Sequence, residues 1–228
     1  AINDEDIYDI LTKDISPMKN SYVKYDLIVL DEVQDMTKMH YKYLMKFIKD
    51  MDMKPLFLII GHVDQSIFQF KGADSRYLTM CDELFPGEFI KKTLTETFRL
   101  TGNMVSFINE VIFGYTKYKP KKNKGKKVTY IKCDTYDNEL FEYLVKRIKE
   151  YDINDVYIEA PSIVSDKIPI KRFENFIANN HKEIPVHIPK SDNDYTNDTS
   201  CENKIAMTNY HKVKGSEKSL TIIFGFDE

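Results

Sequence analysis

Two adjacent acids, Asp31 and Glu32, end an apolar run that occupies residues 27–30. A strand of this kind places the residues that follow it at the carboxyl edge of a sheet, where open α/β folds bind ligands. One acid of such a pair can hold Mg²⁺, and its neighbour can accept the proton of an attacking water. The pair suits hydrolysis of a nucleoside triphosphate, although two acids after a strand are more often a solvated loop.

A second polar loop, GHVDQSIFQFKGA at residues 61–73, follows another apolar run at 56–60. Since both loops follow apolar strands, we expect them to lie on the same sheet edge. Gln65 can hydrogen-bond a terminal phosphate or an attacking water. Phe68 and Phe70, followed by Lys71, can offer stacking faces beside a cation, as in single-stranded nucleic acid binders. For each aromatic alone, packing into a core is the more common explanation.

Two further stretches carry candidate chemistry. Arg99 follows an apolar run at 89–94, and its planar guanidinium can bind phosphate oxygens in pairs, while Phe98 beside it can stack on an adenine. The commoner role of such an arginine is a surface ion pair. Residues 205–217 combine a strand, a basic turn with a glycine, and an acid, which is a weak signal by itself.

The elements that must position these loops alternate along the chain, which predicts an α/β fold with parallel sheets covered by helices on both faces. Apolar spacing predicts helices at 4–13, 38–50 with Thr37 as the N-cap, 104–112, 136–150 and 167–179. Strands are predicted at 25–30, 56–60, 89–94, 128–132, 155–159, 184–188, 204–208 and 220–224, with a polar loop at 189–203. Seven of the eleven residues from 117 to 127 are lysines, which predicts a solvated loop or a phosphate-binding segment.

Composition fits a packed, water-soluble α/β protein of one large or two modest domains. The 228 residues are 42% hydrophobic and 30% charged, and the formal net charge of −3 gives no global attraction to nucleic acid. Cys81, Cys133 and Cys201 lack the spacing of a disulfide framework or a zinc site. We expect reduced thiols, no membrane association and an intracellular location, with nucleus, cytoplasm and viral factory left open.

Taken together, the four stretches resemble the motifs of superfamily 1 helicases of the UvrD/Rep type. The resemblance covers motif II at residues 31–35, motif III at 61–73, motif IV at 94–99 and motif V at 211–217. It implies P-loop NTPase lobes of the RecA-like fold. Residues 1–90 would be the C-terminal half of the first lobe, which would be incomplete, and residues 91–228 the second lobe, incomplete at its C-terminus.

The resemblance also implies ATP, Mg²⁺ and single-stranded DNA as ligands, with a role for each matching residue. On the nucleotide side, Asp31 would hold Mg²⁺ and Glu32 would activate water. The other nucleotide contacts would be Gln65 at the γ-phosphate, Arg99 as the arginine finger, Phe98 on the adenine, and Glu217. The DNA contacts would be Phe68, Phe70, Lys71, His211 and Lys214.

Some positions depart from the family pattern. His62 stands where a second acid is usual, Lys71 where arginine is usual, and Phe70 where tryptophan is common. Lysine keeps the charge but loses the fork of arginine. Thr208 lies three residues before His211, one more than the family spacing, so it receives no role.

The phosphate-binding GxxxxGK[ST] loop does not occur in this sequence. We therefore expect a fragment of an ATP-dependent DNA helicase, moving 3′ to 5′ in the parent protein and unable to hydrolyse ATP by itself. It would be a monomer or joined to the rest of the helicase. The alternative is a non-catalytic, helicase-derived nucleic-acid-binding or scaffold module. A small GTPase-like switch is disfavoured by Gln34, Asp35 and Gln65.

Overall fold

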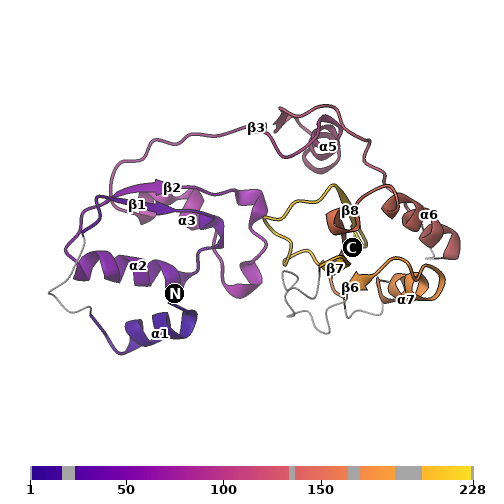
Figure 1. Cartoon of the computed structure of the whole chain (residues 1–228). Coiled ribbons are helices and arrows are strands. Elements are labelled where there is room, and N and C mark those ends of the chain that lie inside the picture. Colours follow the sequence, from indigo (N-terminus) through magenta and orange to yellow (C-terminus); the bar gives the residue numbers. More distant parts are fainter. Residues whose placement is uncertain (1, 17–23, 134–136, 164–169, 188–201, 227–228) are drawn as a thin grey trace. The chain divides into compact units, whose positions relative to one another are not determined.

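The computed structural model describes residues 2–16, 24–133, 137–163, 170–187 and 202–226. The chain divides into two compact units, the first comprising residues 1–100 and 113–122 and the second residues 101–112 and 123–228 (Figure 1). The chain therefore crosses between the units three times. The polar loop predicted at 189–203 lies mostly outside the described residues. The assignment of residues 1–90 and 91–228 to two RecA-like lobes stays a prediction.

The first unit is built on two parallel strands and the helices beside them. Its elements are α1 (Asp4–Thr12), β1 (Leu27–Leu30), α2 (Lys38–Asp50), β2 (Leu56–Ile59), α3 (Arg76–Thr79), α4 (Cys81–Leu84), β3 (Glu96–Thr97) and β4 (Lys119–Pro120). The helices predicted at 4–13 and 38–50 are confirmed. Thr37 is the N-cap of α2, and its hydroxyl accepts the N–H of His40 at 3.2 Å.

The β1–β2 sheet has one buried and one exposed face. The strands are parallel, with Leu27 opposite Leu56 and Leu30 opposite Ile59. Alternate side chains pack inward on α2, α3 and α4, and Figure 1 shows α2 between this sheet and α1. The side chains on the opposite face are largely exposed, with Leu27 at 52% and Leu56 at 74%. Here the expectation of helices on both faces was wrong.

Two predicted strands are absent from the structure. Residues 89–94 and 128–132 are irregular, and the nearest strands are the two-residue pair β3 and β4. Ile90 and Leu94 are 85% and 93% exposed, so this apolar run has no sheet to join among the described residues. An apolar run forms a strand only where a neighbouring strand takes its hydrogen bonds.

The second unit contains a four-stranded parallel sheet in the order β6-β7-β5-β8. Its elements are α5 (Gly102–Phe107), a π-helical turn at Ile108–Phe113, α6 (Asn138–Ile148), β5 (Val156–Ala160), α7 (Ile170–Asn180), β6 (Val186–His187), β7 (Ile205–Asn209) and β8 (Leu220–Ile223). Helices α6 and α7 pack on the face formed by Ile158, Ile205 and Met207. Parallel sheets and helices in both units confirm the predicted α/β class.

The other face of this sheet carries a buried acid. Glu159 of β5 lies opposite Thr208 of β7, and both side chains are buried. Desolvation by burial raises the pKa of Glu159 from its usual 4.5 to about 7. A raised carboxyl pKa means that ionisation is harder in the folded state than in the unfolded one. The folded unit therefore loses stability as the pH rises from about 4.5 to about 7.

We expect Glu159→Gln to stabilise the protein at pH 8 and to have little effect at pH 5. The gain at pH 8 should be on the order of 1–3 kcal/mol, because the variant has no charge to bury. Urea unfolding monitored by circular dichroism at both pH values measures the difference. Glu139→Gln, on the exposed surface of α6, is the matched control. Equal free energies of unfolding for Glu159→Gln and the wild type at pH 8 would contradict this account.

Candidate active site

The acid pair lies at the carboxyl end of β1, where the chain turns sharply. Glu32 has φ 52° and ψ 39°, the left-handed conformation that a residue with a side chain adopts at a cost of about 1 kcal/mol or more. The N–H of Glu32 donates to Oδ1 of Asp31 at 2.9 Å. Both acids are exposed, so their carboxylates are accessible at the sheet edge.

Gln34 joins this turn to the loop after β2. Its side chain is fully buried; its Nε2 donates to the Glu32 carboxylate, and its Oε1 accepts the N–H of His62 at 2.9 Å. The Ser66 hydroxyl donates to the backbone oxygen of Gln34 at 3.3 Å. A buried amide with both ends hydrogen-bonded fixes the two loops against each other. Sequence reasoning did not place Gln34 in the site, since a polar residue among acids is usually exposed.

Gly61 leaves the space that the Gln34 side chain occupies. A Cβ at this position would lie 2.5 Å from Oε1 of Gln34 and 3.0 Å from Cδ2 of Leu78. Such a contact is closer than any real one, so a side chain at position 61 would displace the amide. The sequence shows a glycine directly after the apolar run at 56–60, but it does not show that this glycine faces Gln34.

Gln65 ends a short 3₁₀ turn at Val63–Gln65 and is exposed. Its N–H donates to the backbone oxygen of His62 at 3.0 Å, and the Ser66 N–H donates to that of Val63 at 3.1 Å. The structure therefore brings the Gln65 loop, defined as residues 61–66, beside the acid pair through Gln34. This juxtaposition is the one that the two loops predicted.

Phe68, Phe70 and Lys71 form a compact aromatic–cationic group. The two ring centroids are 6.4 Å apart, and Nζ of Lys71 lies 5.3 Å from the centroid of Phe68 and 5.8 Å from that of Phe70. Phe68 is half-buried, whereas Phe70 is 67% exposed. Phe70 thus does not pack into a core.

The remaining predicted residues lie elsewhere in the two units. Phe98 and Arg99 follow β3 in the first unit; Phe98 is exposed, and the Arg99 N–H donates to the Thr97 hydroxyl at 3.3 Å. In the second unit, the turn after β7 carries His211 and Lys214, both half-buried, and an exposed Glu217. Their roles stay predictions.

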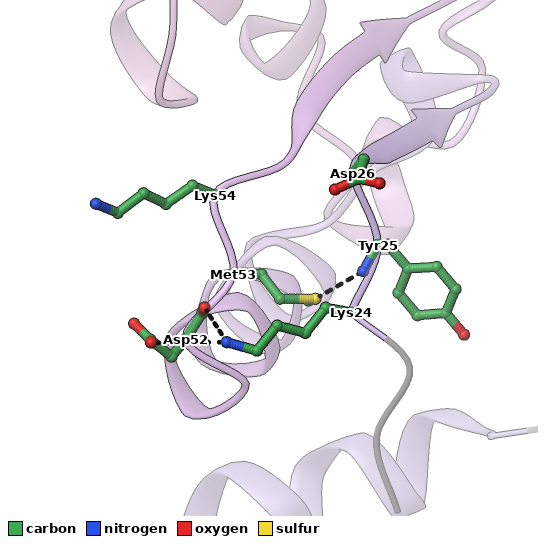
Figure 2. A pocket seen from close by; sticks show the side chains of 6 residues that line it. All are labelled: Lys24, Tyr25, Asp26, Asp52, Met53 and Lys54. Atoms are coloured by element: carbon green, nitrogen blue, oxygen red, sulfur yellow. Dashed lines mark hydrogen bonds and ion pairs between the residues drawn. The ribbon is translucent and has the colours of Figure 1, made fainter.

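A polar hollow lies at the other end of the β1–β2 sheet (Figure 2). It is lined by Lys24, Tyr25, Asp26, Asp52, Met53 and Lys54. Lys24 Nζ donates to the Asp52 backbone oxygen at 3.1 Å, which closes the two connecting loops on each other. These residues precede β1 and β2, so the hollow lies at the opposite sheet edge from the acid pair. It is no candidate for the nucleotide.

The described residues contain neither a cluster of metal ligands nor a membrane span. They contain no group of three or more histidines, cysteines or acids placed to hold a metal ion. None of their helices has the length and apolar character needed to cross a bilayer. A single carboxylate such as Asp31 remains compatible with magnesium, which commonly takes only one or two protein ligands together with phosphate oxygens and water.

Comparison with known proteins agrees with this geometry. Residues 6–86 match the family model of the UvrD/REP helicase N-terminal domain. The chain is 33% identical over 133 residues to the ATP-dependent DNA helicase PcrA of Staphylococcus epidermidis, which covers 56% of this chain and 18% of the relative. It is 28% identical over 139 residues to PcrA of Staphylococcus aureus, covering 58% and 18%.

The chain therefore spans about a fifth of the length of these relatives. The matched region contains both the acid pair and the Gln65 loop. The resemblance that the motifs indicated is confirmed: over about half of its length, this chain is related to the superfamily 1 DNA helicases of the UvrD/Rep type.

Proposed function

We propose that this chain is part of the motor of an ATP-dependent DNA helicase that couples ATP hydrolysis to 3′ to 5′ movement along single-stranded DNA. The observation that carries the proposal is the hydrogen bonding of Gln34 to Glu32 on one side and to His62 on the other. A hydrolytic site needs its general base and its phosphate-binding group at a fixed separation. The buried amide supplies that separation between Glu32 and the Gln65 loop.

The residues of the acid pair fit a magnesium nucleotide. Asp31 offers an exposed carboxylate at the sheet edge, and bound Mg²⁺ would offset the charge of the phosphate oxygens. Glu32 would accept the proton of the attacking water while Gln34 orients its carboxylate. Gln65 would hydrogen-bond the γ-phosphate. Arg99, Phe98 and Glu217 would complete the nucleotide contacts as an arginine finger, an adenine-stacking ring and an acid on the nucleotide side.

The aromatic–cationic group would bind the DNA strand. A base can stack on the exposed ring of Phe70, with Phe68 behind it and the Lys71 ammonium near a backbone phosphate. His211 and Lys214 would add contacts from the second unit. Loss of the γ-phosphate contact at Gln65 would then change the position of Phe68, three residues away. This would couple the state of the nucleotide to the binding of the DNA strand.

Since no GxxxxGK[ST] loop occurs in these 228 residues, we propose that this chain does not hydrolyse ATP alone. Such a loop must come from additional sequence, as in a complete helicase. The competing proposal, a non-catalytic binding or scaffold module, makes the acid pair dispensable. The two proposals differ in what the acid pair does when a phosphate-binding loop is present.

We expect the isolated chain to show no ATP turnover with single-stranded DNA. A chimera in which residues 6–86 replace the matching segment of S. epidermidis PcrA should hydrolyse ATP. Glu32→Gln in that chimera should lower the turnover about 100-fold or more, because the general base is lost. Glu83→Gln, on the surface of α4, should leave the turnover unchanged. Turnover that is independent of Glu32 would favour the non-catalytic module.

We expect Phe70→Ala to weaken binding of a fluorescein-labelled oligothymidylate by about tenfold, because one stacked base contributes roughly 1–3 kcal/mol. Fluorescence anisotropy at constant salt measures the change on the intact chain. Tyr8→Ala removes a similarly exposed ring from α1 and serves as the control. Equal affinities of Phe70→Ala and the wild type would show that Phe70 does not contact the DNA.

We expect Gly61→Ala to lower the free energy of unfolding by roughly 1–3 kcal/mol, because the new methyl collides with the Gln34 amide. The penalty should shrink in a Gln34→Ala background, where the colliding atom is gone. A double-mutant cycle in urea isolates this coupling. Additive effects of the two substitutions would show that the amide does not occupy the space beside Gly61.

A further inference from the structure

Four side chains from two distant segments meet at the Gln65 loop. His62 and Asp64 belong to that loop, whereas Lys117 and Tyr118 come from residues 113–122, which we call the return segment. The Tyr118 hydroxyl lies 2.6 Å from His62 Nε2 and 3.1 Å from Asp64 Oδ2. Lys117 Nζ forms an ion pair with the same Asp64 oxygen. All four residues lie in the first unit.

The single proton of the Tyr118 hydroxyl decides the direction of these hydrogen bonds. The Asp64 carboxylate can only accept, so the hydroxyl donates to it and its oxygen accepts from the Nε2–H of His62. The other ring nitrogen, Nδ1, is buried without a hydrogen-bond partner among the described residues, since Oδ2 of Asp64 lies 3.7 Å away, beyond hydrogen-bond length. A nitrogen without a proton is the better occupant of that position, because a buried N–H left unpaired is costly. Both observations indicate the Nε2–H tautomer.

The charges of the group agree with this arrangement. Burial raises the pKa of Asp64, but hydrogen bonds from Lys117 and Tyr118 outweigh burial, and the net pKa is lowered. Burial and the Asp64 hydrogen bond raise the pKa of Tyr118 to about 12. At neutral pH the carboxylate is therefore charged and the phenol is protonated. Lys117 Nζ also lies 4.3 Å from the Phe113 ring centroid, which holds the ammonium in place.

We propose that Lys117 and Tyr118 are positioning residues that clamp the Gln65 loop by holding His62 and Asp64. The clamp continues a polar chain that begins at the acid pair. Gln34 holds the backbone of His62, Tyr118 holds its imidazole, and the His62 carbonyl in turn accepts the N–H of Gln65. The importance of Gln65 rests on the proposed function, whereas the clamp itself rests only on these contacts.

The position of the return segment in the chain gives the clamp a consequence. Residues 113–122 belong to the first unit, but the residues before and after them belong to the second. The segment that carries Lys117 and Tyr118 therefore continues into the second unit at both of its ends. A movement that pulls on this segment acts directly on the Gln65 loop.

The clamp predicts a local effect of Tyr118→Phe in the full chain. Amide hydrogen exchange of Gln65 and Ser66, whose N–H groups close the loop, should accelerate by about tenfold, as for the loss of one charge-assisted hydrogen bond. Amides of α2 should exchange at the wild-type rate. Tyr115→Phe, which removes an exposed hydroxyl from the same segment, is the control. Unchanged exchange at Gln65, or the same acceleration in α2, would overturn the proposal.

The ¹⁵N chemical shifts of the His62 imidazole provide a second measurement, which a loss of overall stability alone would not change. In the wild type, ¹⁵N shifts at a pH where the ring is neutral should report the Nε2–H tautomer, and Tyr118→Phe should shift the ring toward a mixture of tautomers. Lys117→Arg should retain the wild-type exchange at Gln65, and Lys117→Met should accelerate it. A wild-type Nδ1–H tautomer, or equal exchange in the two Lys117 variants, would contradict the clamp.

These measurements use neither nucleotide nor DNA. The clamp can therefore fail while the chimera still hydrolyses ATP through Glu32, which would leave the proposed function intact. Conversely, the chimera could be inactive while Tyr118→Phe still accelerates amide exchange at Gln65. That result would support the clamp and contradict the proposed function.

Discussion

The buried amide of Gln34 is the interaction on which the arrangement of the first unit depends. Parallel strands with four residues each provide few hydrogen bonds, and the loops beyond them have no ladder to hold their shape. A side chain that is fully buried must have both its donor and its acceptor paired, and Gln34 achieves this only when the acid turn and the Gln65 loop are both in place. Satisfying one buried amide thus determines where two exposed loops lie.

The features of this chain that follow local rules could be predicted from its sequence. Helix α2 was predicted with its bounds and its Thr37 cap, because apolar spacing and capping act within one element. Strands β1 and β2 were predicted from their apolar runs, and with them the meeting of the acid pair and Gln65. The runs at 89–94 and 128–132 look equally strand-like, but a strand also needs a neighbour, which composition does not reveal.

The rest of the site depends on contacts between distant residues. Tyr118 lies 56 positions from His62, and nothing in the lysine-rich stretch around it indicates that one ring is held between an acid and a histidine. Gln34 looks like one more exposed residue in an acidic run until the glycine facing it is seen. Such contacts have no periodicity, so only coordinates reveal them.

The two sheets of the protein differ in how they treat their second face. In the second unit, even the polar residues Glu159 and Thr208 are buried, and this burial raises the pKa of the Glu159 carboxyl. In the first unit, the outer face of β1 and β2 exposes leucines and a valine. Contiguous apolar surface of this kind favours association with another apolar surface.

At Glu32, the residue type that best fits the left-handed backbone differs from the residue type that the proposed chemistry needs. Glycine and asparagine adopt this conformation with less strain, so either would ease the turn after β1. Neither carries a carboxylate, however, so a substitution that eases the backbone at this position would also remove the group that we propose as the general base. The strained backbone at Glu32 is therefore what we would expect if this residue is the general base that we propose.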